Sequence, residues 1–252
     1  MILVTGGTGT LGKHVVPLLQ QGGHEVRILS RQYGADLSTG EGVDAALDGA
    51  DIVLHLAGSQ KGDGGKARTL VRAAKNAGRP HLIYISVVGC ERIPVKSSMD
   101  RGGFGYFAEK REAELVIESS GLPWTTLRAT QFHDLTLKVA QGAAKLPVMP
   151  AFAGVRFQPV ETAEVATRLV QLTLGDPAGL VTDLAGPQPY AMTDLFRLYL
   201  RATGRHRAIV PLRGAGGAYR AVRAGANLPL NGADLGRVTW EDFLVAQFGV
   251  TA

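Results

Sequence analysis

Residues 4–16 read VTGGTGTLGKHVV, and this stretch decides the fold of the chain. It places Gly6, Gly9 and Gly12 at a G-x-x-G-x-x-G spacing, between an apolar run at residues 2–4 and a segment of helical periodicity. Glycines at this spacing allow a tight turn and close backbone approach, and the following helix offers unpaired N–H groups to a pyrophosphate. The stretch therefore predicts a strand, a phosphate-binding turn and a helix.

The alternative is a glycine-rich turn that serves the structure alone, since a glycine pattern by itself is a weak sign of function. Its place after a buried strand and before an amphipathic helix favours the binding turn. The residues expected to contact a dinucleotide here are Gly6, Thr8, Gly9, Thr10, Leu11 and Gly12.

Short apolar runs alternate with helical patterns through the first half of the chain. Residues 66–78 read as a helix with Gly78 as its C-cap, whereas residues 31–51 leave room for only a very short strand and a helix. Strands alternating with helices predict an α/β, Rossmann-type fold with a doubly wound parallel sheet covered on both faces. Beyond residues 2–4, the predicted strands lie within 24–31, 50–58, 81–86 and 123–129.

The rhythm changes from about Gln131, where prolines begin to interrupt the pattern. The elements predicted beyond it are a helix at 161–174 with Thr162 as N-cap, a strand at 180–186 and a helix at 194–204 ended by Gly204. We expect a single domain over residues 1–252. Within it we expect a dinucleotide-binding core at 1–135 and a small C-terminal lobe at 136–252 that supplies the substrate pocket.

The end of the strand at 24–31 decides which dinucleotide fits. A carboxylate about 20 residues beyond the glycines would bind a ribose 2′-hydroxyl and repel a 2′-phosphate. This chain has Ser30 and Arg31 there, 18 and 19 residues after Gly12, and arginine binds phosphate through several charge-assisted hydrogen bonds. The alternative is a solvated arginine at a strand end. We predict NADP(H) as the cofactor.

Composition argues against several other classes of protein. The 252 residues carry a net charge of +5, but the basic residues are scattered, so we expect no nucleic-acid partner. No apolar run approaches the ~20 residues of a membrane span, and the first residues enter a core strand, so we expect a cytoplasmic protein that binds no membrane. The lone Cys90 fits a reducing compartment, and no ligand cluster predicts a metal site.

Residues 105–114, GYFAEKREAE, carry Tyr106 and Lys110 four positions apart, so a helix would place both on one face. That face continues through the apolar Ala113, which predicts that Lys110 lies near buried surface. The alternative is an exposed ion pair between Lys110 and Glu114.

Together these segments resemble the short-chain dehydrogenase/reductase superfamily, specifically its atypical, NmrA-like branch. The resemblance covers essentially the whole chain and concerns fold and cofactor more than substrate. It rests on the Tyr106–Lys110 pair and on TGGTGTLG (5–12), LSR (29–31), DIVLHLAGS (51–59), HLIYISVVG (81–89), SGLPWTTLRATQFHD (120–134) and RFQPVETAEVA (156–166).

The resemblance implies roles for individual residues. Tyr106 would be the proton donor, and Lys110 would bind the nicotinamide ribose and lower the pKa of the tyrosine. Asp36, on the short third strand, would lie near the adenine. The residues implied on the nicotinamide side are Ala57, Gly58 and Ser59, and Ser86 joins the cofactor-binding set.

One position departs from the family pattern. Active members usually carry a second serine or threonine within the HLIYISVVG segment, where this chain has Val87 after Ser86. Valine cannot hydrogen-bond a substrate oxygen, so Ser97 or Ser98 is a candidate substitute, or the stretch 92–105 forms a flexible lid.

Gln131 and His133 follow the last predicted core strand, at the carboxyl edge where such sheets bind ligands. His133 is a candidate second acid or substrate contact, although a lone histidine more often serves the structure.

The sequence predicts an NADPH-dependent reductase of a small, rather apolar carbonyl, quinone or similar acceptor. It is also compatible with a protein that forms a homodimer. The alternative is an NADP(H)-sensing regulatory protein that acts through a protein partner without turnover. Val87 fits that alternative, whereas the Tyr106–Lys110 pair fits the enzyme. A third hypothesis is an isomerase that uses the cofactor transiently.

Overall fold

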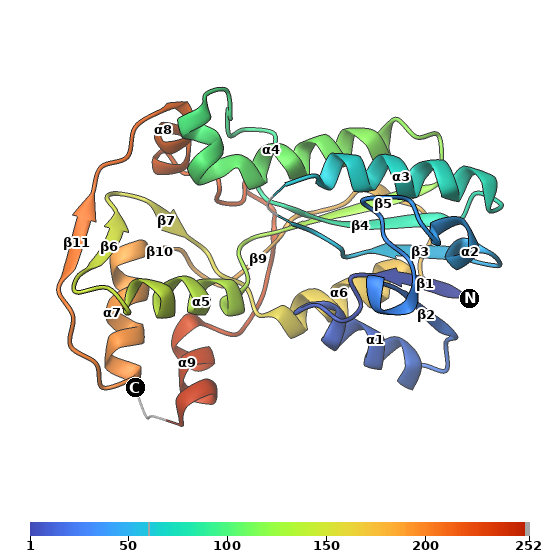
Figure 1. The fold of residues 1–252 in the computed structure, drawn as a ribbon. Helices are drawn as coiled ribbons and strands as arrows, with labels where there is room; N and C mark the ends of the chain where they lie inside the picture. The colour runs from blue at the N-terminus through green and yellow to red at the C-terminus, as the bar shows by residue number, and fades with distance from the viewer. Residues whose placement is uncertain (60, 250–252) are drawn as a thin grey trace.

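The apolar run at residues 2–4 forms the second strand from one edge of a parallel sheet in the computed structural model, which describes residues 1–59 and 61–249 (Figure 1). The sheet consists of β1 (Ile2–Thr5), β2 (Val26–Leu29), β3 (Ile52–His55), β4 (His81–Val87), β5 (Trp124–Ala129), β8 (Gly179–Leu180), β9 (Leu184–Ala185) and β12 (Asp234–Leu235). Its order is β12-β9-β5-β4-β3-β1-β2, with β8 beside β5. Parallel pairing brings the carboxyl ends of β1, β3, β4 and β5 to one edge.

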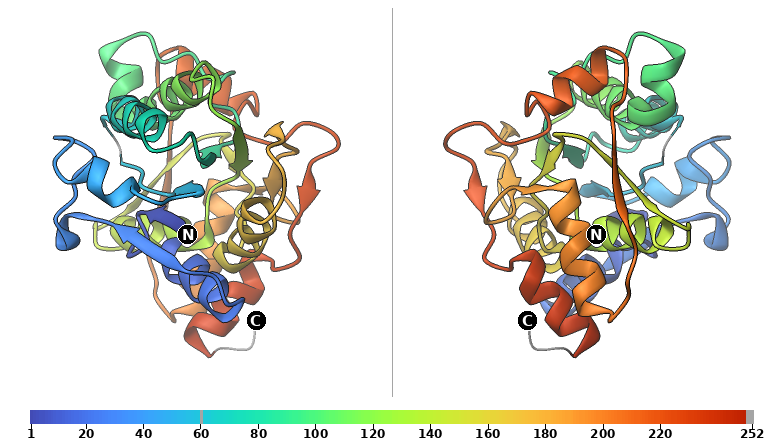
Figure 2. Two further views of the ribbon diagram at one scale, coloured as in Figure 1. Left: turned by 90° about the vertical axis from the view of Figure 1, so that its right-hand side faces the viewer. Right: turned by 90° about the vertical axis from the view of Figure 1, so that its left-hand side faces the viewer.

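Two helical layers cover the sheet. α1 (Gly12–Gln21) and α6 (Thr162–Thr173) lie on one face, and α2 (Val43–Leu47), α3 (Asp63–Asn76) and α4 (Ser98–Glu118) lie on the other (Figure 1). Figure 2 shows the sheet from its ends, between these layers. The predicted doubly wound α/β fold is confirmed.

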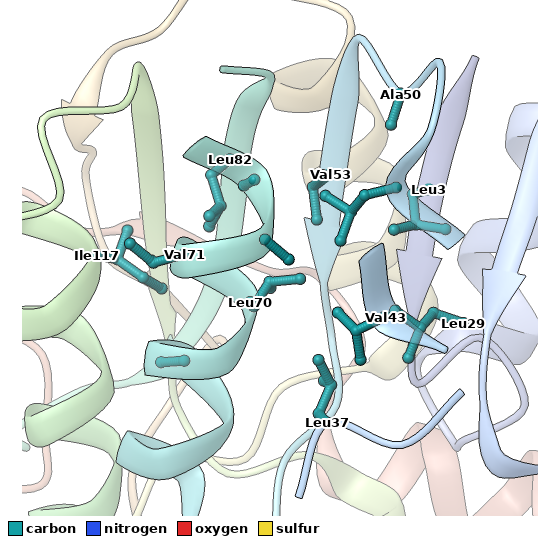
Figure 3. Close-up of a cluster of buried hydrophobic side chains, with 14 of the residues drawn as sticks. Leu3, Leu29, Leu37, Val43, Ala50, Val53, Leu70, Val71, Leu82 and Ile117 are labelled. Atoms are coloured by element: carbon teal, nitrogen blue, oxygen red, sulfur yellow. The ribbon is translucent and has the colours of Figure 1, made fainter. Parts of the chain in front are cut away.

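Each face of the sheet has its own apolar core. On the α3 and α4 side, Leu70 and Val71 of α3 pack with Leu82 of β4 and Ile117 of α4 (Figure 3). On the other side, residues of α1 and α6 such as Val15 and Leu169 are fully buried. Complete burial of one such side chain contributes about 1.5–3 kcal/mol, so the two cores fix the frame on which the strand ends lie.

The remaining elements form a lobe at the carboxyl ends of the strands. They are α5 (His133–Ala143), β6 (Met149–Phe152), β7 (Arg156–Phe157), β10 (Tyr190–Ala191), α7 (Met192–Ala202), β11 (Ile209–Leu212), α8 (Gly217–Arg223) and α9 (Trp240–Phe248). β11 pairs with β6, and β10 with β7. The right-hand view of Figure 2 shows α7 and α9, in orange and red, on this side of the molecule. Within the described residues, the chain forms no helix with the length and apolar character of a membrane span.

The short third strand expected near Asp36 is not formed. A 3₁₀ helix (Arg31–Tyr33) follows β2, and residues 34–42 then make turns. The N–H of Asp36 donates to the carbonyl of Glu41, and the N–H of Ser38 donates to Asp36 Oδ1 at 2.7 Å. These local bonds occupy the backbone groups that strand pairing would need.

Two predictions in the second half need smaller corrections. α6 begins at Thr162, so its N-cap is Glu161, and the hydroxyl of Thr162 donates to Asp134 instead of capping the helix. The strand predicted at 180–186 is formed as two separate two-residue strands, β8 and β9, because the chain leaves β5 between them.

Candidate functional site

The glycine turn between β1 and α1 is packed too closely for side chains. Gly6 has a φ of +70°, and a Cβ placed on it would lie 2.7 Å from the nitrogen of Ala57, just beyond β3. A Cβ on Gly12 would overlap the carbonyl of Gly6. Close backbone approach therefore requires glycine at both positions, and it draws the turn against the end of β3.

The turn offers unpaired N–H groups to a ligand. No acceptor among the described residues binds the N–H groups of Thr8, Thr10 or Leu11. The first turn of α1, which lies within the part of the chain that the structure describes, has neither an acidic residue nor a side-chain cap. Unpaired donors and the positive end of the helix dipole favour an anion here, so the turn fits a pyrophosphate.

A second group of polar atoms lies at the end of β2. The Oγ atom of Ser30 is buried and has no hydrogen-bond partner among the described residues, and Arg31 next to it is exposed. Asp36 lies in the turns that follow, where the N–H of Ala35 donates to the carbonyl of Ser30 at 3.2 Å. A buried hydroxyl beside an exposed guanidinium fits a 2′-phosphate.

Lys110 is a buried cation at the carboxyl edge of the sheet, with 3% of its surface exposed. Its Nζ donates to the carbonyl of Ile85 at 3.3 Å, lies 3.4 Å from Oδ2 of Asp63, and lies 4.9 Å from the centroid of the Tyr84 ring. Burial opposes the charge, but Tyr84 and Asp63 outweigh it and hold the pKa of Lys110 above its ordinary value. The predicted burial of Lys110 is confirmed.

The loop after β3 joins Lys110 to the glycine turn. Ala57 is the residue that Gly6 contacts, and a Cβ on the next residue, Gly58, would lie 2.9 Å from Nζ of Lys110. Ser59 follows in the same loop. The structure thus brings the predicted residues 57–59 together with Lys110 and the glycine turn.

Three buried polar residues around Lys110 are not revealed by sequence patterns: Asp63, Tyr84 and His55. Asp63 is 1% exposed, and its Oδ1 accepts a hydrogen bond from the N–H of Ser59 at 2.8 Å. The ring of His55 stacks on Tyr84, and burial, together with the charge of Lys110, lowers the pKa of His55 to about 3. Only Asp63 carries a sequence signal, as an acid at a helix start, and that signal is common at helix N-termini.

Tyr106 lies one helical turn before Lys110 on α4, with its ring centroid 5.6 Å from Nζ. Its side chain is partly exposed, at 37%. Partial burial raises the pKa of Tyr106 above its ordinary value, and the carboxylate of Asp63 and the thiol of Cys90 raise it further. In this structure the pKa of Tyr106 therefore lies above its ordinary value and not below it, chiefly because of burial.

The position of the usual second serine is filled by apolar packing. Val87 is 5% exposed and belongs to a cluster that includes Phe107 of α4 and Val155 of the lobe. Ser86 is also buried, and its Oγ lies 3.8 Å from Sγ of Cys90.

Ser97 has a structural role as the N-cap of α4. The N–H of Asp100 donates to the hydroxyl oxygen of Ser97 at 3.1 Å, and the backbone N–H of Ser97 donates to Oδ2 of Asp100 at 3.1 Å, which completes a capping box. The exposed Ser98 is the first helical residue. The prediction of a flexible lid over 92–105 is therefore wrong for its second half, which is helix.

His133 and Gln131 differ in their surroundings. His133 is fully buried, its Nδ1 lies 3.1 Å from Oε2 of Glu161, and its ring centroid lies 4.9 Å from that of Phe243. These contacts favour the structural interpretation of His133. By contrast, both amide atoms of Gln131 are buried without a hydrogen-bond partner among the described residues, so this side chain can bind a polar ligand at the sheet edge.

Two surface hollows lie away from these residues. One, of about 770 Å³, is at the end of α7 and includes Arg201 and Arg205; the other, of about 260 Å³, lies beside Arg128. Among the described residues, no group of three or more His, Cys, Asp or Glu side chains is arranged to hold a metal ion.

Comparison with known proteins identifies relatives along most of the chain. A family model described as NAD(P)H-binding matches residues 33–174. A (4-alkanoyl-5-oxo-2,5-dihydrofuran-3-yl)methyl phosphate reductase of Streptomyces griseus is 30% identical over 222 residues, covering 81% of this chain and 74% of that protein. Quinone oxidoreductase 2 of Escherichia coli is 24% identical over 226 residues, covering 81% and 75%.

Solved structures show the same architecture. The NADPH-dependent quinone oxidoreductase of Escherichia coli, in complex with NADPH, has a TM-score of 0.76 at 20% identity and covers 98% of this chain and 100% of its own. The triphenylmethane reductase of Citrobacter sp., in complex with NADP(H), has a TM-score of 0.70 at 19% identity, covering 98% and 99%. These likenesses confirm the predicted fold.

Proposed function

The chain belongs to the NAD(P)H-binding family and is an NADP-dependent oxidoreductase, and from that premise we propose that it reduces a small, rather apolar carbonyl or quinone with Tyr106 as proton donor. Its relatives include reductases of a furanone phosphate and of quinones, both small molecules. The acceptor class and the residue roles are proposed from the site itself.

The observation that carries this proposal is an unbroken set of contacts from the glycine turn to Tyr106. Gly6 approaches Ala57, Gly58 approaches Nζ of Lys110, and Nζ lies 5.6 Å from the Tyr106 ring. A cofactor whose pyrophosphate binds the turn can extend along this edge towards the lysine and the tyrosine. A glycine turn with a purely structural role would not need this alignment.

Each group has a distinct task in the proposed reaction. Bound NADPH supplies the hydride. Lys110 donates hydrogen bonds to the nicotinamide ribose, and Tyr106, a neutral phenol whose pKa is raised above the ordinary value of 10.0, donates a proton to the acceptor oxygen. The residues proposed to hold the rest of the cofactor are Gly6, Thr8, Gly9, Thr10, Leu11 and Gly12 at the pyrophosphate, Ser30, Arg31 and Asp36 at the adenosine end, and Ala57, Gly58, Ser59 and Ser86 nearer the nicotinamide.

Aromatic residues between α4 and the lobe support an apolar acceptor. Phe104 of α4 lies 6.0 Å, between ring centroids, from Phe152 of β6, which in turn lies 5.9 Å from Tyr219 of α8. Phe152 is 37% exposed. Phe104 and Phe152, which are partly exposed, are suited to a flat, apolar acceptor, and the lobe would thus supply one wall of the pocket.

The test is consumption of NADPH by the purified protein over a panel of quinones, ketones and aldehydes, with NADH in parallel. We expect turnover of at least one acceptor class and a preference for NADPH. Tight NADPH binding with no consumption over the whole panel would contradict a reductase of these acceptors.

Val87 favours a second candidate, an NADP(H) sensor that acts through a protein partner. The valine side chain is sealed in apolar packing and cannot polarise a substrate oxygen. The sensor predicts NADPH binding without turnover and a partner that is retained in pull-downs only in one cofactor state. The sensor would be excluded if NADPH is consumed and if the cofactor has no effect on which proteins are retained in the pull-down.

A further inference from the structure

Asp63, the first residue of α3, joins Lys110 to the cofactor loop, which is the loop after β3 that carries residues 57–59. Its carboxylate and the Lys110 side chain are 1% and 4% exposed, and Oδ2 lies 3.4 Å from Nζ. A Cβ on Gly58 would lie 2.9 Å from Nζ and 3.4 Å from Oδ2, so glycine lets the ion pair sit directly against the loop backbone. The other oxygen, Oδ1, accepts hydrogen bonds from the N–H and the hydroxyl of Ser59 at 2.8 and 3.0 Å.

The backbone of Asp63 is fixed independently of its side chain. Oε2 of Glu109 accepts hydrogen bonds from the N–H groups of Gly62 and Asp63 at 2.8 and 3.0 Å. The start of α3 is thereby anchored to α4, and the Asp63 carboxylate is directed inward to the lysine. Glu109 of α4 also provides a carboxylate beside the same loop, and among the described residues its hydrogen bonds go to the loop backbone and not to Lys110.

The charge felt by Tyr106 depends on both members of the buried pair. An ammonium stabilises a nearby phenolate, and a carboxylate destabilises it. Asp63 is the one carboxylate among the described titratable groups that act on Lys110 and Tyr106, and the raised pKa of Tyr106 agrees with its influence. Those groups are Tyr84 of β4, Cys90 after β4 and Asp63 of α3. The buried His55 of β3 faces the same pair, and Nζ of Lys66 in α3 lies 3.5 Å from Oδ1 of Asp63.

We propose that Asp63 is a positioning residue of the reductase: it fixes the Lys110 ammonium under the cofactor loop and offsets its charge, so that Tyr106 is kept as a proton donor. This inference rests on the proposed function. During reduction the acceptor carbon would gain the hydride that NADPH loses as it becomes NADP⁺, the O–H bond of Tyr106 breaks as a new O–H bond forms on the acceptor, and solvent reprotonates the phenolate. Alcohol oxidation would need the phenolate at the outset, so the site favours reduction.

The test is an ultraviolet titration of the Tyr106 phenolate, obtained as the difference between each protein and the same protein carrying Tyr106→Phe. We expect Tyr106 to ionise about one pH unit lower, or more, in Asp63→Asn, because the carboxylate that opposes the phenolate is gone. Asp63→Glu, which keeps the charge, should titrate as the parent does. An unchanged titration in Asp63→Asn would overturn the proposal.

Glu109→Gln is the matched control, because it removes a carboxylate that contacts the same loop from α4, while the amide oxygen of glutamine can still accept hydrogen bonds from the two N–H groups. It should titrate as the parent does; a shift equal to that of Asp63→Asn would mean that loop disorder, and not the charge of Asp63, moves the tyrosine. The titration needs no turnover, so it separates failure of this inference from failure of the proposed function.

Should Asp63→Asn fail to fold, the double variant Asp63→Asn/Lys110→Met removes the pair without leaving one buried charge. If Asp63 offsets the charge of Lys110, Tyr106 in the double variant should ionise at the same pH as in the parent. Ionisation at a lower pH than in the parent would contradict the proposal.

In an active enzyme, Asp63→Asn should also raise the rate of alcohol oxidation relative to the rate of reduction. A ratio equal to that of the parent would contradict the assigned role.

Discussion

Lys110 pairs with a residue that lies far from it in the sequence. The i,i+4 pair with Glu114, considered from spacing alone, is wrong: Arg128 of β5 binds Glu114 through two hydrogen bonds of 2.8 Å, and Lys110 lies against Asp63 of α3. Spacing on one helix cannot reveal these pairs, because both partners belong to other elements. Burial makes the choice decisive, since a buried charge needs a partner.

Arg31 tests the predicted cofactor preference at the scale of one side chain. We expect Arg31→Ala to weaken NADPH binding tenfold or more and to leave NADH binding nearly unchanged, because hydrogen bonds to a charged group are worth about 1.5–3 kcal/mol. Binding is measured by cofactor fluorescence. An equal loss for both cofactors would show that Arg31 acts on the fold of the turn and not on a 2′-phosphate.

His55 gives a pH dependence whose sign follows from its burial. Its pKa is lowered from 6.5 to about 3 in the folded protein. Between these pH values His55 is protonated in the unfolded chain but stays neutral in the folded chain. His55 therefore contributes stability that is present above pH 6.5 and is lost on the way down to about 3.

Urea unfolding measures this contribution. Between these pH values the unfolding free energy of the parent should fall about 1.4 kcal/mol per pH unit more steeply than that of His55→Gln. Parallel pH profiles for the two proteins would contradict the assignment.

At the scale of one element, α4 begins earlier than its composition suggests. Gly102, Gly103 and Gly105 lower helix propensity in its first turns, which is why a loop was the natural expectation there. The capping box of Ser97 and Asp100 starts the helix nonetheless, and the N–H of Ala218 in α8 donates to Oδ1 of Asp100 at 3.0 Å. Tertiary contact with α8 is absent from any local pattern.

The cap predicts a difference between two adjacent serines. Ser97→Ala should lower the unfolding free energy by about 1 kcal/mol, because it removes the N-cap, whereas the exposed Ser98→Ala should change it by a few tenths at most. Both variants should keep NADPH oxidation. A large loss of activity in Ser97→Ala with little loss of stability would instead make Ser97 the substitute for the missing serine.

At the scale of the whole molecule, the lobe is docked on the loop after β4. The side chain of Arg92 donates to the carbonyls of Ala226 and Leu228 at 3.2 and 2.9 Å. Gly89 has a φ of +87°, and a Cβ on it would overlap the Ala226 carbonyl. The position of the pocket wall relative to Tyr106 therefore depends on this contact.

Gly89→Ala should destabilise the protein more than Gly78→Ala. Both glycines have left-handed φ angles, +87° and +85°, so both substitutions incur backbone strain, but a Cβ on Gly78 meets open space. The extra overlap should add at least about 1 kcal/mol to the loss at Gly89, measured by urea unfolding. Equal losses would show that the lobe is free to move away from the loop.

The doubly wound sheet of this protein can be predicted from its sequence, whereas the contacts between its buried polar side chains cannot. Strand and helix periodicity and the Gly6–Gly12 turn predict the doubly wound sheet, because each is a local pattern. The third strand at Asp36 is absent because turn bonds between nearby residues take its backbone groups. Asp63, Tyr84 and His55 gather around Lys110 only when α3, β4 and β3 pack with α4, so no local pattern shows that these residues meet.

The most direct test of the account compares NADPH oxidation by the parent and by Tyr106→Phe, with NADPH affinity measured on both. Loss of a positioned proton donor typically lowers the rate by 10²–10⁴-fold, so we expect a fall of at least about a hundredfold in turnover and an affinity within a few-fold of the parent. Equal turnover by the two proteins would contradict the claim that Tyr106 is the proton donor of an NADPH-dependent reductase.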